Sequence, residues 1–193
     1  MTESHPLEIT YEDHATVTEL LDVIQFCLED ISLNFDRWDE PYTRGPGLYI
    51  AIVSGRSLRD YADAMGDNHW PIEKSRHVLD DITDFYETAK EVASSQDGAV
   101  VISVDGVVQR QMVRFRDLST DHSHEQRENT SLEYAEWMGS RHMSALDTSV
   151  RSAVVTTITL SAENGRVTIF RNGKFIAQTR DELSAEWRVH AND

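Results

Sequence analysis

Two short polar motifs contain residues that could do chemistry. The first, Asp97-Gly98-Ala99, puts a carboxylate at the entry of an apolar run, and the second, "MGSRHMSAL", places Arg141 and His142 among small residues. A carboxylate can bind a metal ion or accept a proton, whereas a guanidinium and an imidazole can hold phosphate oxygens. Each motif also has a plainer interpretation. Asp97-Gly98 is a common turn, and Gly139 can end a helix with Arg141 near its negative C-terminus.

Hydrophobic periodicity predicts the elements that must position these residues. Apolar residues three and four apart predict helices over 15–34, 57–65 and 72–95, and a further helix that begins at Leu132. Apolar runs predict a strand at 48–55 and strands on both sides of Asp105-Gly106, a dipeptide typical of hairpin turns. Two more strands flank Glu163-Asn164-Gly165, and a short one surrounds "RNGKF". Together these predict an α/β fold with a mixed central β-sheet flanked by helices and an N-terminal helical extension.

The charge balance is strongly acidic. The 193 residues include 34 Asp and Glu against 18 Lys and Arg, for a formal net charge of −16. Such a charge makes a compact fold repel itself in dilute buffer, whereas at about 1 M salt the Debye length falls to roughly 3 Å and screens the repulsion. The composition resembles that of cytoplasmic proteins from halophilic archaea. It argues against nucleic acid and against an anionic membrane as partners, because both are bound through phosphate neutralisation.

The sequence also indicates where the protein is located and how its single cysteine is used. No run approaches the roughly 18 apolar residues of a membrane span. The N-terminal "MTESHPLEITYEDH" lacks the basic and apolar regions of a secretory signal, so we expect a cytoplasmic protein. The single cysteine, Cys27, lies in an apolar helical stretch, where we expect it to be buried.

Taken together, the two motifs resemble those of the diadenylate cyclase domain. "DGAVVIS", a gap that contains a hairpin, "MGSRHMSAL" and "LSAENGRVTIFRNGKF" follow one another in the order and spacing of that family. "GLYIAIVSGRSLRDYADAM" falls where family members have an apolar strand, a Gly-containing turn and a Leu-x-x-Tyr helix. The resemblance covers roughly residues 44–178 and, with the acidic composition, is greatest to the archaeal branch. It divides the chain into an N-terminal helical extension (1–43), a diadenylate cyclase-like domain (44–180) and a C-terminal tail (181–193).

The resemblance implies a reaction in which two ATP molecules condense to cyclic di-AMP and two pyrophosphates. A divalent metal, Mn²⁺ or Mg²⁺, is expected as cofactor. Each 3′-hydroxyl attacks the α-phosphate of the nucleotide that faces it across a subunit interface. We therefore expect a homo-oligomer with face-to-face sites.

Residue by residue, the resemblance implies catalytic roles for Asp97, Arg141 and His142, and metal binding by Asp97 and Glu163. The residues implied in ATP binding surround the two motifs: Gly98, Ala99, Ser140, Arg141, His142 and Ser144.

Four positions depart from the family pattern. Ser140 replaces the usual threonine and keeps its hydroxyl. Met143 stands where a second arginine is usual; either Arg151 or another nearby base replaces it, or turnover is slower. Val150 stands where the family commonly has glutamate, and Gln96 where some members have histidine. Met143 and Val150 keep an alternative open, a non-catalytic adenine-nucleotide-binding or sensor module of the same fold.

For other charged residues, a position on the solvated surface is the preferred interpretation. Arg110, Arg114 and Arg116 alternate and share one strand face, as a solvated edge or, alternatively, as an interface or phosphate contact. The acid pairs Asp80-Asp81 and Asp63/Asp67 are expected on solvated helix faces.

Two further groups of residues, two histidines and four tryptophans, could have either a structural or a ligand-binding role. His122 and His124 lie in a polar segment that predicts an exposed loop, and their His-x-His spacing would bind a metal only if a third ligand converged on it. Packing, rather than base stacking, is expected of the four tryptophans, Trp38, Trp70, Trp137 and Trp187.

Overall fold

A computed structural model describes residues 14–55, 58, 60–118 and 132–190. Its elements, in chain order, are α1 (Ala15–Asn34), β1 (Leu48–Val53), β2 (Ala62–His69), α2 (Ile82–Ser95), β3 (Ala99–Ser103), β4 (Gln111–Phe115), α3 (Ser140–Ser149), β5 (Val154–Leu160), β6 (Val167–Arg171), β7 (Lys174–Gln178) and α4 (Arg180–His190). The seven strands form one sheet in the order β2-β4-β3-β1-β5-β6-β7. Strands β1 and β3 are parallel, and the other pairs are antiparallel. The predicted fold class, an α/β fold with a mixed sheet flanked by helices, is confirmed.

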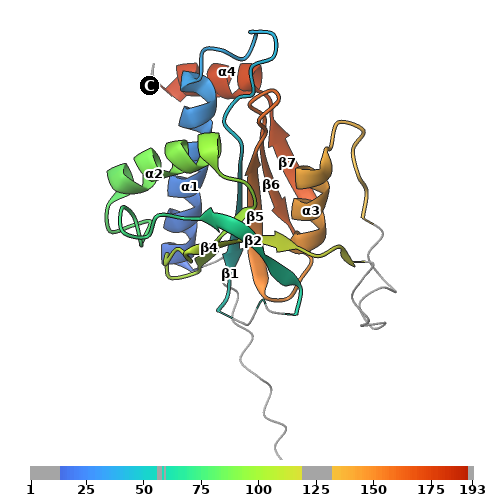
Figure 1. Ribbon diagram of the computed structural model, residues 1–193. Coiled ribbons are helices and arrows are strands. Elements are labelled where there is room, and N and C mark those ends of the chain that lie inside the picture. Colours follow the sequence, from blue (N-terminus) through green and yellow to red (C-terminus); the bar gives the residue numbers. More distant parts are fainter. Residues whose placement is uncertain (1–13, 56–57, 59, 119–131, 191–193) are drawn as a thin grey trace, which may run out of the picture.

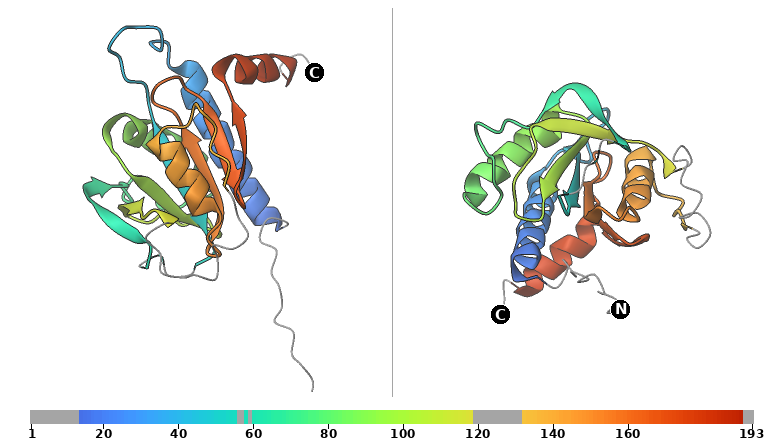
Figure 2. Two further views of the ribbon diagram at one scale, coloured as in Figure 1. Left: turned by 90° about the vertical axis from the view of Figure 1, so that its right-hand side faces the viewer. Right: turned by 90° about the horizontal axis from the view of Figure 1, so that it is seen from below.

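Strand β1 lies at the centre of the sheet and is buried at all of its positions. Because successive side chains of a strand point to opposite faces, this burial requires a cover on each face. Helices α1 and α2 cover one face and α3 covers the other (Figures 1 and 2). Two apolar cores result, one on each side of the sheet.

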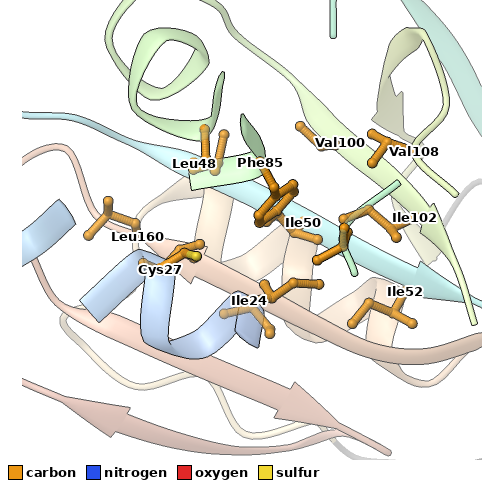
Figure 3. Close-up of a cluster of buried hydrophobic side chains, with 14 of the residues drawn as sticks. Ile24, Cys27, Leu48, Ile50, Ile52, Phe85, Val100, Ile102, Val108 and Leu160 are labelled. Carbon is orange, nitrogen blue, oxygen red and sulfur yellow. The ribbon is translucent and has the colours of Figure 1, made fainter. Parts of the chain in front are cut away.

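The larger core lies between the sheet and helices α1 and α2. Ile50 of β1 and Phe85 of α2 meet there with Ile24 and Cys27 of α1, all of them fully buried (Figure 3). The expected burial of Cys27 is confirmed. Loss of hydration in this position raises the pKa of its thiol to about 12.

The smaller core joins the opposite face of β1 to α3. Tyr49 and Ala51 point to this face and share it with Ala145 and Leu146 of α3. The hydroxyl of Tyr49 donates to the carbonyl of Ser144 over 3.3 Å. Helix α3 is thereby fixed against the central strand.

The C-terminal segment, predicted as a tail, contains helix α4, which packs against α1. The rings of Phe26 and Trp187 stack with their centroids 5.2 Å apart, and the Trp187 indole N–H donates to Glu29 over 2.8 Å. Leu183 is fully buried. No helix among the described residues is long and apolar enough to cross a membrane.

The predicted helix over 57–65 is wrong, because residues 62–69 form strand β2 at the sheet edge. Its backbone pairs with β4, with Ala62 opposite Phe115. Asp63, expected on a helix face, forms a bidentate ion pair with Arg116 beyond the end of β4. Cross-strand pairing here outweighs a local apolar spacing that is compatible with either structure.

The helix predicted over 72–95 begins only at Ile82. The residues before Asp81 form turns, and Asp81 is the N-cap of α2. Its carboxylate accepts a hydrogen bond from the backbone N–H of Asp84 over 3.0 Å. A short polar side chain before the first helical residue satisfies an amide that has no partner within the helix. Asp81 is therefore a helix cap and not a member of a solvated helix face.

The helix predicted to begin at Leu132 is also wrong. Residues 132–139 form turns and irregular chain, and Met138 packs into the smaller core. Gly139 is the N-cap of α3 and does not end a helix. Arg141 consequently lies in the first turn of α3, at the positive end of its dipole.

The burial of α1 has a measurable consequence. We expect Ile24→Ala to lower the free energy of unfolding by about 2–5 kcal/mol, because a fully buried side chain is replaced by a cavity. Denaturant titration measures the change. Glu19→Ala, on the exposed side of the same helix, is the matched control and should stay within about 0.5 kcal/mol of wild type. Equal effects of the two changes would show that α1 does not belong to the folded core.

Candidate functional site

The strand order brings three loops together at one end of the sheet. Because β1 and β3 are parallel, both begin at this end, with Tyr49 opposite Ala99. Strand β5 is antiparallel to β1 and ends here, with Leu160 opposite Leu48. The chain just before β1, just before β3 and just after β5 therefore meets in one place, although these segments are far apart in the sequence.

Asp97 and Gly98 form the link between α2 and β3. The backbone N–H of Asp97 donates to the side chain of Asn68 over 2.9 Å, and that of Gly98 donates to the Asp97 carboxylate over 2.9 Å. Gly98 has a φ of +101°, which a residue with a Cβ rarely adopts. An added Cβ would also come within 3.1 Å of Met65 and of the Val113 carbonyl. The backbone at this position requires glycine.

Arg141 reaches across the end of the sheet to Asp97. Its guanidinium Nη2 lies 3.2 Å from the Asp97 carboxylate, across a separation of 44 residues. The guanidinium passes over Gly47, where a Cβ in place of hydrogen would lie only 2.4 Å from Nη1 and 2.7 Å from the side chain of Ala162. The absence of a side chain at Gly47 leaves the space that Arg141 occupies.

His142 turns away from solvent and is only 7% exposed. Its ring packs edge-on against Trp137, at 5.2 Å between centroids, and near Phe170. Burial, with the positive charges of Arg166 and Arg141, lowers its pKa from 6.5 to about 4. The imidazole is therefore neutral at pH 7, so of the two neighbours Arg141 and His142 only the arginine brings a positive charge. The buried Nε2 of His142 has no hydrogen-bond partner among the described residues.

The three loops at this end of the sheet, together with the start of α3, line a cavity of about 610 Å³. This size is typical of a pocket for a small molecule. All eight residues that the sequence analysis selected line it: Asp97, Gly98, Ala99, Ser140, Arg141, His142, Ser144 and Glu163. The structure thus brings the candidate residues together, while their roles stay predictions.

The cavity wall also contains charged residues that the motifs did not indicate. Arg44, before β1, and Asp117, after β4, line the cavity. So does Arg114, for which a phosphate contact was the alternative interpretation, whereas Arg110 and Arg116 do not line it. Arg44 lies in a Pro/Gly-rich segment without periodicity, and only its position before the buried strand could have indicated its place at the cavity.

The expected substitute for a second arginine is not at the cavity. Arg151 is 6% exposed and lies over the ring of Tyr61, at 4.2 Å, and it donates to the Arg116 carbonyl over 2.7 Å. Met143 itself is exposed. Arg151 therefore stabilises the junction of α3 with the β2–β4 edge and is not placed to hold a ligand in the cavity.

Two carboxylates could contribute to a metal site. Asp97 and Glu163 both line the cavity, but nowhere in the described part of the chain do three His, Cys, Asp or Glu side chains gather as metal ligands. Mg²⁺ is commonly held by one or two carboxylates together with substrate phosphates and water. The donor set fits an ion shared with a triphosphate and does not fit a cage built by the protein alone. His122 and His124 lie outside the described residues.

The tryptophans pack as expected. Trp70 is fully buried against Phe85, and Trp187 stacks on Phe26. Trp137 is partly exposed and supports His142 on one side and the Arg166 guanidinium, at 4.1 Å, on another.

Comparisons with known proteins concern the fold. A protein from Bacillus cereus, described as a hypothetical membrane spanning protein, has a solved structure that aligns with a TM-score of 0.53 and 16% identity, over 83% of this chain and 64% of that chain. The chain thus spans less than two thirds of that structure. A double mutant of DacA from Staphylococcus aureus aligns with a TM-score of 0.47 and 17% identity, over 88% of this chain and 95% of that chain. Neither a family model nor a curated protein matches the chain. At these identities the first likeness shows a shared fold.

The contact between Gly47 and Arg141 gives a structural prediction. We expect Gly47→Ala to displace the Arg141 side chain and to break its ion pair with Asp97, because the new methyl group would overlap the guanidinium. A crystal structure of the variant measures the displacement. Gly139→Ala adds a methyl group at the same cavity where no atom lies within 4 Å, and it should leave Arg141 in place. An unmoved Arg141 in Gly47→Ala would contradict the prediction.

The burial of His142 predicts a dependence on pH. A pKa of about 4, against 6.5 for an exposed histidine, means that the unfolded chain takes up the proton first as the pH falls. Stability should therefore fall between pH 6.5 and 4, and this part of the fall, at most about 3 kcal/mol, should be absent in His142→Gln. Denaturation at several pH values measures the difference. A His142 imidazole NMR signal that titrates near pH 6.5 would show that the ring is not buried.

Proposed function

We propose that the chain is a diadenylate cyclase, which joins two ATP molecules into cyclic di-AMP and releases two pyrophosphates. The observation that carries this proposal is the meeting of Asp97 and Arg141 in one cavity of about 610 Å³. Residues of the two motifs that resemble the cyclase family thereby line one cavity. The shared fold is compatible with the proposal but does not carry it.

The phosphate end of ATP is assigned to the start of α3. Arg141 supplies a guanidinium, and the hydroxyls of Ser140 and Ser144 line the same wall. The first turn of a helix adds backbone N–H groups that have no partner within the helix. The neutral His142 also lines this wall, but its unpartnered Nε2 is buried, so it can bind a phosphate oxygen only after the side chains around it move.

Asp97 is the candidate for accepting the proton of the attacking 3′-hydroxyl. Its side chain is 59% exposed and the side chain of its partner Arg141 is 20% exposed, so the ion pair that joins them is partly solvated. Such pairs contribute about 0–1 kcal/mol, and a ligand can separate them at little cost. Arg141 can then turn to phosphate, which leaves the Asp97 carboxylate free to act on the hydroxyl.

Asp97 and Glu163 would hold the divalent metal, Mn²⁺ or Mg²⁺. A bound metal ion would offset the negative charge that builds up on the phosphate oxygens. Among the charged residues that line the cavity, three arginines are balanced by three carboxylates: Arg44, Arg114 and Arg141 against Asp97, Asp117 and Glu163. A triphosphate with about four negative charges is not neutralised by this set alone, which supports a requirement for the metal.

The product requires two copies of the chain. One cavity holds one nucleotide, whereas the cyclic product has two equivalent halves, each with one 3′-oxygen bound to the phosphate of the other. Two cavities must therefore face each other, which is the usual consequence of a two-fold symmetric interface. We propose a homo-oligomer that assembles through this face.

A nucleotide-binding sensor of the same fold is the second candidate. The ion pair with Arg141 favours it, because an aspartate held by an arginine is already engaged in the free protein. The exposed Met143, in place of an arginine, points in the same direction. A sensor would bind ATP or cyclic di-AMP and release either one unchanged.

Incubation with ATP and Mn²⁺ separates the two candidates. In molar KCl, which suits the acidic composition, we expect the wild type to form cyclic di-AMP and pyrophosphate, as measured by chromatography. Asp97→Asn should lower the rate by about 10²- to 10⁴-fold, because it removes the group that accepts the proton. Asp22→Asn, an exposed change of the same kind on α1, is the control and should leave the rate unchanged. ATP binding without any product from wild type would support the sensor.

A further inference from the structure

The loop between α1 and β1 brings one more cation to the cavity. We propose that Arg44 binds the phosphates of the nucleotide, and that Trp38 and Ser32, in the N-terminal extension, position it. This inference rests on the proposed function, since it concerns the same cavity. It gives the extension (1–43), which lies outside the resemblance to the cyclase family, a part in ligand binding.

Arg44 lines the cavity and is exposed to it. Among the described residues, its guanidinium forms neither a hydrogen bond nor an ion pair, in contrast to Arg141, which is bound to Asp97. A guanidinium that is free to bind and faces a cavity can form charge-assisted hydrogen bonds with a phosphate, often two at once. The ligand class that fits it is a nucleotide with an extended phosphate chain, because Arg141 already provides the first cationic contact.

The backbone beside Arg44 is fixed to the wall that carries Glu163. The N–H of Gly45 donates to the carbonyl of Ala162 over 2.9 Å, and that of Gly47 donates to the carbonyl of Ala93 over 2.9 Å. Arg44 is thus tied on one side to the β5–β6 turn and on the other, through the start of β1, to α2.

The Trp38 ring holds this arrangement in place from outside the cavity. It fills the space that a side chain at Gly45 or Gly165 would need, since a Cβ at these positions would lie 2.1 Å and 2.8 Å from the ring. The indole N–H donates to the carbonyl of Ser32 over 3.0 Å, and the hydroxyl of Ser32 donates to the carbonyl of Gly165 over 2.5 Å. The end of α1, the loop and the β5–β6 turn are therefore one packed unit, and a loop fixed in this way loses little further entropy when Arg44 binds a ligand.

The test measures the equilibrium binding of 3′-deoxy-ATP, which lacks the attacking hydroxyl and cannot cyclise, and of 3′-deoxyadenosine, which lacks phosphates. We expect Arg44→Ala to raise the Kd for 3′-deoxy-ATP by about 10- to 100-fold, the range for a lost charged hydrogen bond. The Kd for 3′-deoxyadenosine should change by less than about threefold. Arg110→Ala removes the same charge from an exposed position outside the cavity and is the matched control.

The positioning role is tested at Trp38 and Ser32. Trp38→Ala should weaken binding of 3′-deoxy-ATP and leave 3′-deoxyadenosine unaffected, whereas Trp38→Phe, which keeps a ring over the glycines, should restore most of the affinity. Ser32→Ala is a second, milder change that tests the same link if Trp38→Ala does not fold. Wild-type affinity in Ser32→Ala and in a folded Trp38→Ala would overturn the positioning role.

The outcomes separate this inference from the cyclase proposal. An unchanged Kd in Arg44→Ala, with a raised Kd in Arg141→Ala, would overturn the role of Arg44 alone. A raised Kd in Arg44→Ala, in a protein that forms no cyclic di-AMP from ATP, would support the role of Arg44 and overturn the catalytic proposal. Wild-type affinity in both arginine variants would place the nucleotide outside this cavity and overturn both.

Discussion

The pairing of β1 with β3 on one side and β5 on the other is the constraint on which the site depends. It sets the start of two strands and the end of a third side by side, so that Gly47, Asp97 and Glu163 belong to neighbouring loops. Side chains on both faces of β1 are buried, and a shift of register by one residue would exchange the two cores. The geometry of the cavity is therefore determined by the same apolar contacts that stabilise the sheet, and Arg141 is brought to it by the docking of α3 on β1.

The sequence predicted the parts in which a local signal and the tertiary structure agree. The apolar run of β1, the turn at Asp105-Gly106 with its positive φ at Gly106, and the spacing of α1 each had one strong interpretation. The segment around Met65 and the one before Gly139 did not, because apolar residues three apart suit a helix, a twisted edge strand or a turn equally well. In both cases the partner, β4 or the smaller core, is distant in the sequence and decided the outcome.

The same distinction applies to the cavity. Asp97 and Arg141 could be selected from their motifs, whereas Arg44 could not, since its place follows from hydrogen bonds of Gly45 and Gly47 to strands and helices far along the chain. The neutral state of His142 could not be predicted from the sequence either, because it results from burial beside Arg166.

The charges that line the cavity are balanced in a chain with a formal net charge of −16. An anionic ligand thus meets far less repulsion there than over the rest of the surface.

Cys27 gives the larger core an unusual property. Its sulfur lies between α1 and the sheet, fully buried, and its pKa of about 12 keeps it protonated at neutral pH. A thiol reagent reacts with thiolate, so it can modify this chain only in molecules whose α1 has separated from β1 and β5. The rate at which a thiol reagent modifies Cys27 therefore reports how often this core opens. A ligand that stabilises the packing of the loop after α1 would lower that rate without contacting the cysteine.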